Sequence, residues 1–595
     1  MKRILPILII AAITITSCTK NITGINVDPT QFTRVLPEGL MNSVFRTTPA
    51  MLSPSPVNKY WEYANWISPP GRYDAGDAMW QTAYVNVLQN LAQVINQYGN
   101  DTGFVNRIQI ARIYRAYIHS ILAGSYGPVP ITQANNLTYL NTVMFDSEDS
   151  AYLNILATLK DAASKINVAR TNDKLTYDAI YGGDLLKWKK FANTLRLKIA
   201  LRCTRNQGAA ATAVITEVMA DEANLIGSEA EAAKVQFDNT ANGNQNPFYV
   251  TYSGIVAPFT LSFPKLNDFM LAFLRSYKDP RLDVYFDSVK VVANRYVLTD
   301  TLTSLADDSL RVVTYPVPHW GMPKSPTKLA GWQPDLAGLP DPIGNINTYS
   351  NVAAVVWNNP LRPFVLLGYA ETLLMKAEAA QLGLGGSKTA DAYYYAGIDA
   401  NFAFWSAGST PANPSASLAA AAAYKLVNGV KWGSSGKGLR NYNGITNANI
   451  PDGDINKIYV QEWMNYYPDQ GFDAWCLQRR TWVLAFPPHT NPASSGFLFS
   501  DVPYRTNYPG NLNSLNPVGY ADALSKLNLV VGSEGINNYT ALKFMAPHTV
   551  LNWDAVPAQY DYSEIQKWYG ATIESLKAAA AASGFTYQVT QTYKP

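Results

Sequence analysis

Paired amphipathic segments constrain the fold of this chain more than any other feature of its sequence. Apolar residues recur at helical spacing in eight segments, which are 81–98, 104–123, 149–166, 183–202, 364–382, 390–404, 455–467 and 472–482. Short breaks rich in Gly, Pro or Asn divide three of the pairs, as at Gly99-Asn100. Short breaks predict antiparallel helix hairpins, and such pairs stack when one pair cannot bury its apolar face alone. Because the spacing between pairs is irregular, the sequence predicts one large α-dominated body rather than a regular array.

Two long regions interrupt the helical pattern. Residues 204–360 and 483–556 are rich in Pro, Gly, Asn and aromatic residues, and they contain β-type runs at 289–297 and 309–317. Connections this long inside a compact body usually carry function. We therefore expect a helix-pair scaffold at about 80–203 and 362–482, with a loop-rich lobe and minor β structure formed by the intervening regions.

Charge and composition exclude several classes of protein. Lys plus Arg minus Asp plus Glu is 47 − 44 = +3 over 595 residues, and no long Lys/Arg run is present. A nucleic-acid partner needs a concentrated basic face, so none is expected. The mean hydropathy of −0.10 argues against a polytopic membrane protein. Three cysteines cannot form a disulfide framework.

The N-terminus has the pattern of a bacterial lipoprotein signal peptide. Lys2 and Arg3 precede an apolar run, 4–15, which is followed by Thr16, Ser17 and Cys18. A dozen apolar residues are too few for a membrane span, which needs about 20, but they suit a signal peptide. The residues before Cys18 resemble a lipobox, so we expect removal of residues 1–17 and lipidation of Cys18. The alternative is an ordinary signal peptide with an incidental cysteine. Cys203 and Cys476 are expected in the core.

The sequence offers no convincing catalytic or metal site. Glu371 and Glu378 lie seven residues apart on one predicted helix face, a separation compatible with inverting glycoside hydrolysis. Their Ala/Leu-rich surroundings favour a structural role, with Arg479 and Arg480 as partners of suitable type. Asp454 is expected to cap the helix that follows rather than to bind calcium. The four histidines are far apart in sequence, and no metal or cofactor is expected.

Aromatic residues in the irregular segments are the better ligand-binding candidates. Flat rings stack on sugar faces or peptide side chains and supply contact area at low entropic cost. The alternative is that these rings pack beneath the loops. The candidates in the segment 53–76 are Trp61, Tyr63, Trp66 and Tyr73, and those in the long middle region are Trp320 and Trp332.

Elements along the chain resemble those of the SusD/RagB-like outer-membrane nutrient-binding lipoproteins. They are Tyr181-Gly182-Gly183-Asp184 with Lys187 to Leu195, Asp279-Pro280-Arg281-Leu282, Tyr369-Ala370-Glu371 with Met375 to Ala380, Gly397-Ile398 as a turn, and Gln461-Glu462-Trp463 with Gly471 to Trp475 and Arg479 to Thr481. Tyr508-Pro509 and Asn552-Trp553-Asp554 match less specifically. The order of the elements makes the resemblance stronger than any one of them.

The resemblance implies four tetratricopeptide-like helix pairs that support an irregular ligand-binding lobe. It also implies a non-catalytic protein, lipid-anchored at the outer membrane, that captures oligosaccharides or peptides. Such a protein delivers its ligand to a SusC-like TonB-dependent transporter. Thr19 to Ile22 lack the acidic signal common on surface-exposed lipoproteins of this kind, and a C-terminal extension at about 557–595 lies outside the matched elements. A hydrolase or a purely structural lipoprotein are the alternatives.

Overall fold

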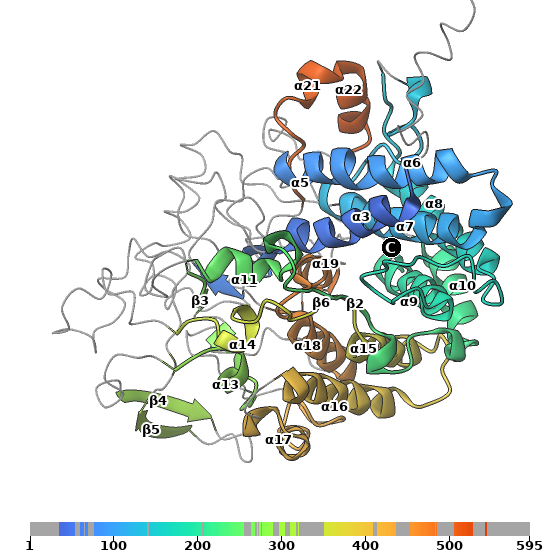
Figure 1. Ribbon diagram of the computed structural model, residues 1–595. Helices are drawn as coiled ribbons and strands as arrows, with labels where there is room; N and C mark the ends of the chain where they lie inside the picture. The colour runs from blue at the N-terminus through green and yellow to red at the C-terminus, as the bar shows by residue number, and fades with distance from the viewer. Residues whose placement is uncertain are drawn as a thin grey trace, which may run out of the picture.

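The computed structural model describes most of the chain between Val35 and Lys543 (Figure 1). The described residues are 35–53, 60–64, 66–68, 77–139, 142–204, 207–254, 263–267, 270–271, 273–274, 277–288, 297–303, 310–316, 319, 350–408, 413–435, 453–481, 483–484, 505–527 and 542–543. Cys18 and the extension at 557–595 lie outside these ranges.

The four predicted helix pairs are present in the described residues, although residues 364–367, expected to begin the third pair, form a strand. They are α6 (Gln89–Tyr98) with α7 (Val105–Tyr126), α8 (Glu148–Lys165) with α9 (Leu185–Cys203), α15 (Tyr369–Gln381) with α16 (Ala390–Gly408), and α18 (Asp454–Tyr466) with α19 (Gly471–Thr481). Contacts between α7 and α8, and between α9 and α15, join successive pairs into one stack. The prediction of a mainly α-helical scaffold is therefore confirmed.

Side-chain caps fix where the helices of the second pair begin. Ser147 accepts a hydrogen bond from the Ser150 N–H at the start of α8. Asp184 accepts bonds from the N–H groups of Leu186 and Lys187 at the start of α9. Such caps satisfy donors that have no partner within the helix, so they stop the helix from extending backwards.

Two details of the third and fourth pairs differ from expectation. Gly397 was expected in a turn but lies within α16, where a Cβ would approach Leu374 Cγ to 2.8 Å. The glycine is required because α15 and α16 cross closely there. Asp454 does not cap α18, because it is the first helical residue and Gly453 is the N-cap. Its carboxylate instead accepts a bond from the Gly433 N–H at 2.8 Å.

Further helices lie outside the predicted pairs. The longest are α3 (Pro37–Leu52), which packs on α6, and α10 (Gly208–Met219), which packs on α9. α5 (Asp77–Gln81) runs through the π-helical η1 (Thr82–Leu88) directly into α6. The remaining α-helices are α4 (Tyr60–Tyr63), α11 (Pro247–Tyr252), α13 (Leu282–Tyr285), α14 (Ala354–Trp357), α17 (Leu418–Tyr424), α21 (Leu512–Leu515) and α22 (Pro517–Ser525). The 3₁₀ turns are η2 (Thr102–Phe104), η3 (Leu137–Tyr139), η4 (Glu222–Asn224), η5 (Glu229–Glu231), η6 (Asn242–Asn244) and η10 (Pro414–Ala416).

Strands in the described residues form antiparallel two-stranded sheets. β1 (Ile67–Ser68) pairs with β3 (Lys265–Leu266), β2 (Ala233–Val235) with β6 (Phe364–Leu367), and β4 (Val297–Thr303) with β5 (Leu310–Pro316). β5 confirms the β-type run at 309–317, and β4 begins at the last residue of the other run, whose residues 289–296 are outside the described ranges. The β4–β5 hairpin projects at the lower left of Figure 1, away from the helix stack.

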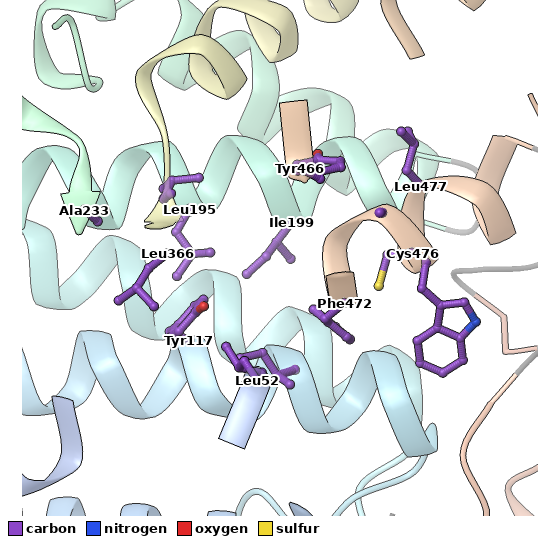
Figure 2. Packing of buried hydrophobic residues seen from close by; sticks show 14 of the residues in the cluster. Leu52, Tyr117, Leu195, Ile199, Ala233, Leu366, Tyr466, Phe472, Cys476 and Leu477 are labelled. Atoms are coloured by element: carbon purple, nitrogen blue, oxygen red, sulfur yellow. The ribbon is translucent and has the colours of Figure 1, made fainter. Parts of the chain in front are cut away.

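One apolar core extends through the helix pairs. Figure 2 shows side chains from α3, α7, α9, β6, α18 and α19 converging, among them Leu52, Tyr117, Ile199, Leu366 and Phe472. Cys203 and Cys476 are buried free thiols in this core, as predicted. Within the described ranges, the helices all fall short of the combined length and apolarity needed to span a bilayer.

Trp188 connects the start of α9 to this core. Its ring is fully buried, and its Nε1–H donates to Asp178 Oδ2 at 2.7 Å. Asp178 also accepts bonds from the N–H groups of Ile180, Tyr181 and Gly183. Burial raises the pKa of Asp178 despite these donors. The Tyr-Gly-Gly-Asp element is therefore a loop wrapped around a buried carboxyl group, with Gly183 at a φ of 87°.

We expect Trp188→Ala to lower the free energy of unfolding by about 3–5 kcal/mol, as truncation of a buried aromatic ring does. Leu186→Ala is the matched control on the same helix, because Leu186 is 46% exposed and its truncation should change stability by no more than about 0.5 kcal/mol. Urea denaturation of the two variants compares them. Equal stabilities would contradict a scaffold role for Trp188.

Candidate functional site

The aromatic segment near residue 60 packs into the core instead of lining a surface. Trp61 is 1% exposed and Trp66 is 0% exposed. The Trp61 Nε1–H donates to the Pro468 carbonyl at 2.7 Å, and the Trp66 ring meets the Tyr467 ring edge-on at 5.6 Å. The expectation that Trp61 and Trp66 are exposed ligand-stacking rings is therefore wrong.

The reason for this burial is a tertiary contact that the local sequence does not reveal. α4 packs on α19, and a Cβ at Gly471 would stand 3.0 Å from the Trp61 ring. The α4 segment therefore packs against the break between α18 and α19. Tyr63 is the last residue of α4. Tyr73, Trp320 and Trp332 lie outside the described residues, so their predicted role remains a prediction.

The two glutamates considered for catalysis are buried ion-pair partners. Glu378 is 1% exposed and forms a bidentate pair with Arg480, at 2.6 and 2.7 Å. Glu371 is 0% exposed; it lies 2.8 Å from Lys198 Nζ and accepts a bond from Gln470 at 2.7 Å. Burial raises the pKa of Glu371, partly offset by Lys198. Because neither carboxylate reaches solvent, the arrangement cannot act on a polymer.

Arg480 also faces a third carboxylate, Glu462, at 3.3 Å. The Glu462 Oε1 atom accepts no hydrogen bond from the described residues. Burial, and to a smaller extent the negative charge of the nearby Glu378, hold the pKa of Glu462 well above its usual value.

Arg479 plays a different part from the one expected. Its guanidinium donates to the Gly124 carbonyl at 2.7 Å and lies 3.4 Å above the Trp475 ring.

The Asp-Pro-Arg-Leu element fixes an irregular segment to the third and fourth pairs. Arg281 is buried and pairs with Asp279 at 2.6 Å. Its guanidinium also donates to Asn401 on α16 and Gln461 on α18, at 3.0 and 2.9 Å. The element therefore holds the irregular segment against α16 and α18.

A polar cavity of about 470 Å³ lies between α6, α7, α8 and the loop at 131–136. Arg115 and His119 reach it from one face of α7, and Ala92 and Ala116 leave room between α6 and α7. Its lining residues are Ala92, Asn96, Arg115, Ala116, His119, Ile131, Thr132, Ala134, Asn135, Asn136, Asn154, Ile155 and Thr158. Sequence reasoning missed this cavity; the only signal was an Arg and a His four residues apart on a mostly apolar helix. Among the described residues, no cluster of side chains is suited to hold a metal ion.

Fold and site together define a stacked helix-pair protein with irregular segments fixed by buried arginine contacts. A family model described as starch-binding and associating with the outer membrane, the SusD-like family, matches residues 38–509. The chain belongs to this SusD-like family. No curated protein sequence matches it significantly.

Solved structures show the same fold. A chitin-binding protein is 20% identical, with a TM-score of 0.63 over 86% of this chain and 100% of that chain. A chitin-binding SusD homolog from Flavobacterium johnsoniae is 19% identical, with a TM-score of 0.63 over 86% and 98%. A SusD homolog from Bacteroides fragilis is 19% identical, with a TM-score of 0.62 over 86% and 100%.

Replacing each of the two carboxylates beside Arg480, Glu462 and Glu378, with a neutral amide should change the stability of the protein in opposite directions. Because the folded-state pKa of Glu462 is raised, its stabilising contribution is complete below about pH 4.5 and is lost as pH rises. Glu462→Gln mimics the protonated group, so its stability relative to wild type should increase from pH 5 to pH 8. Glu378→Gln breaks the bidentate pair and should destabilise by about 3 kcal/mol. Urea denaturation at both pH values measures this, and a loss of stability in Glu462→Gln that grows with pH would contradict the assignment.

Proposed function

We propose that this protein is a non-catalytic, lipid-anchored outer-membrane protein that captures a glycan for a SusC-like TonB-dependent transporter. The match to a family described as starch-binding and associating with the outer membrane carries the proposal, because it extends over the whole helix-pair scaffold. Two similar structures are described as chitin-binding, which supports a polysaccharide fragment as ligand. A peptide ligand is the competing outcome of the binding test.

The buried state of the glutamates supports a binding role rather than hydrolysis. Glycoside hydrolysis requires two carboxyl groups that flank the scissile bond. Glu371 and Glu378 are held by Lys198 and Arg480 inside the helix stack, where no glycan can reach them. Purified protein incubated with starch and chitin oligomers should release no shorter products; shortened oligomers would overturn the non-catalytic assignment.

Ring stacking remains the proposed means of capture, carried by the candidates whose side chains lie outside the part of the chain that the structure describes. These are Trp320, Trp332, Tyr73 and Tyr63. The proposed mature chain carries 45 − 44 = +1, because Lys2 and Arg3 leave with the signal peptide, so long-range charge steering contributes little. Affinity then depends on stacking and hydrogen bonds.

We expect Trp320→Ala to weaken binding of the cognate oligosaccharide by about 1–2 kcal/mol while leaving the unfolding transition in place. Calorimetry with malto-oligosaccharides and chito-oligosaccharides measures the affinity, and a series of short peptides tests the alternative ligand class. Trp61→Ala is the contrasting variant, because loss of that buried ring should lower stability by about 3–5 kcal/mol. Wild-type affinity in Trp320→Ala would place the ring platform elsewhere.

The anchor is tested separately from the ligand. Each buried CH₂ of an acyl chain contributes about 0.8 kcal/mol, so a multiply acylated Cys18 holds the body firmly at a membrane. A Cys18→Ala variant should fractionate as soluble or unprocessed protein in cells that lack the transporter. Cys203→Ala is the matched control, because it removes a cysteine that is buried in the core, and this variant should remain in the membrane fraction. Membrane retention of Cys18→Ala after a high-salt wash would contradict lipidation at this residue.

Delivery to a transporter is the remaining part of the proposal. The gene for a TonB-dependent transporter next to the gene for this protein would name the partner. Co-purification of the two proteins in detergent would support the assignment. A transporter that takes up the glycan equally well after deletion of this protein would argue against it.

A further inference from the structure

The polar cavity between α6, α7 and α8 contains a positive charge that faces no acidic side chain of the described residues. Arg115 lines the cavity, and its described lining includes no Asp or Glu. The other arginines of α7 are paired: Arg107 with Glu38 at 2.9 Å, and Arg112 with Asp161 at 2.6 Å. Arg115 forms no ion pair or hydrogen bond with the described residues. Partial burial, and next the charge of Arg112, lower the pKa of Arg115, as expected where no acid faces it.

His119 presents a second unpartnered group beside Arg115. It is 5% exposed and lies four residues further along α7, hence on the same face. Its ring nitrogens make no hydrogen bond with any residue in the described ranges. Burial lowers the pKa of His119 to about 3, with a smaller contribution from the Arg115 charge. The imidazole is therefore neutral near pH 7 and offers one donor and one acceptor. Buried polar groups nearly always find partners, so this pair is suited to a ligand.

The rim of the cavity is polar and held in place. The Asn135 Nδ2–H₂ group donates to the Tyr84 carbonyl at 3.1 Å and to Gln89 Oε1 at 2.8 Å. The N–H groups of Ile131 and Thr132 donate to the Asp146 carboxylate, at 2.8 and 2.9 Å. Asn96, Asn136 and Asn154 complete the rim, and they are exposed. Amides and hydroxyls on a fixed rim match a ligand that carries several hydroxyl groups.

We propose that this cavity binds an acidic sugar, with the ligand carboxylate on Arg115 and its hydroxyls on His119 and the asparagine rim. One guanidinium matches a single negative charge, and its planar fork fits a carboxylate in bidentate geometry. The volume of about 470 Å³ lies within the range of pockets for small molecules. Among the described lining residues there is no Trp, Tyr or Phe ring, so a neutral sugar would lack the usual stacking surface there. This inference does not depend on the proposed capture of a neutral glycan.

Saturation-transfer NMR on the purified full chain tests the site with D-glucuronate as probe and D-glucose as its uncharged counterpart. Glucuronate should bind at least about tenfold more tightly than glucose. Arg115→Gln should weaken glucuronate binding at least about tenfold, because it removes the guanidinium that is proposed to contact the carboxylate. Ala116→Leu should block binding by filling the cavity while leaving Arg115 in place, and Ala92→Leu serves the same purpose from α6. Arg112→Gln is the matched control on the same helix, and it should stay within about twofold of wild type because Arg112 points at Asp161 instead.

Several outcomes would overturn the proposal. They are equal affinity for glucuronate and glucose, no saturable binding of glucuronate at millimolar concentrations, and unchanged affinity in both Arg115→Gln and Ala116→Leu. Inorganic phosphate binding as tightly as glucuronate would identify a general anion site and refute sugar recognition. By contrast, a Trp320→Ala variant that loses oligosaccharide binding but still binds glucuronate would support the proposal, because it would show that the two ligands bind at different sites.

Discussion

Buried ion pairs between helices hold the second, third and fourth helix pairs together. Lys198 on α9 lies 2.8 Å from both Glu371 on α15 and Asp473 on α19, and Arg480 on α19 forms the bidentate pair with Glu378 on α15. Removing charges from water costs several kcal/mol per ion, so such pairs add little net stability compared with apolar packing. Removing one partner of such a pair, however, leaves an unpaired charge in the core, which destabilises the fold by about 3–5 kcal/mol. We infer that the network selects one alignment of the helix pairs among the many that apolar faces alone would permit.

Buried arginine contacts of the same kind hold described parts of the irregular segments against the helix pairs. Arg281 joins Asp279 to α16 and α18, and Arg362 forms a two-point contact with Asp469 in the break between α18 and α19, at 2.6 and 2.9 Å. Asp469 also accepts the Val365 N–H at 3.0 Å, which positions β6. A planar guanidinium satisfies several acceptors in fixed directions, so one residue can anchor a segment at a point.

How much of this the sequence predicted depends on how local the governing interaction is. The eight paired helices follow from apolar periodicity within each segment, but some of their ends do not. The segment expected to be helical from residue 364 begins as strand β6, because its apolar run pairs with β2, and α15 starts at Tyr369. The burial of Trp61 depends on Pro468, about 400 positions further along the chain, and nothing in the local Pro/Gly-rich context signals it. The Glu378 partner was predicted only by type, because the sequence gives no distances. Arg115 and His119 escaped notice because an isolated pair on an apolar helix usually has a partner, and only the structure shows that these two lack one among the described residues.

Comparison with two other buried arginines shows which contacts Arg115 lacks within the described residues. Arg479 is buried, and it donates to the Gly124 carbonyl and lies over the Trp475 ring. Arg505 donates to the Tyr126 carbonyl at 2.9 Å and lies over the Tyr508 ring. A carbonyl and an aromatic face thus offset the loss of water around each of these charges. Arg115 has neither contact within the described residues; it faces a cavity instead. Its charge is satisfied only by water or by an anion that enters, and the polar rim selects an anion that carries hydroxyl groups.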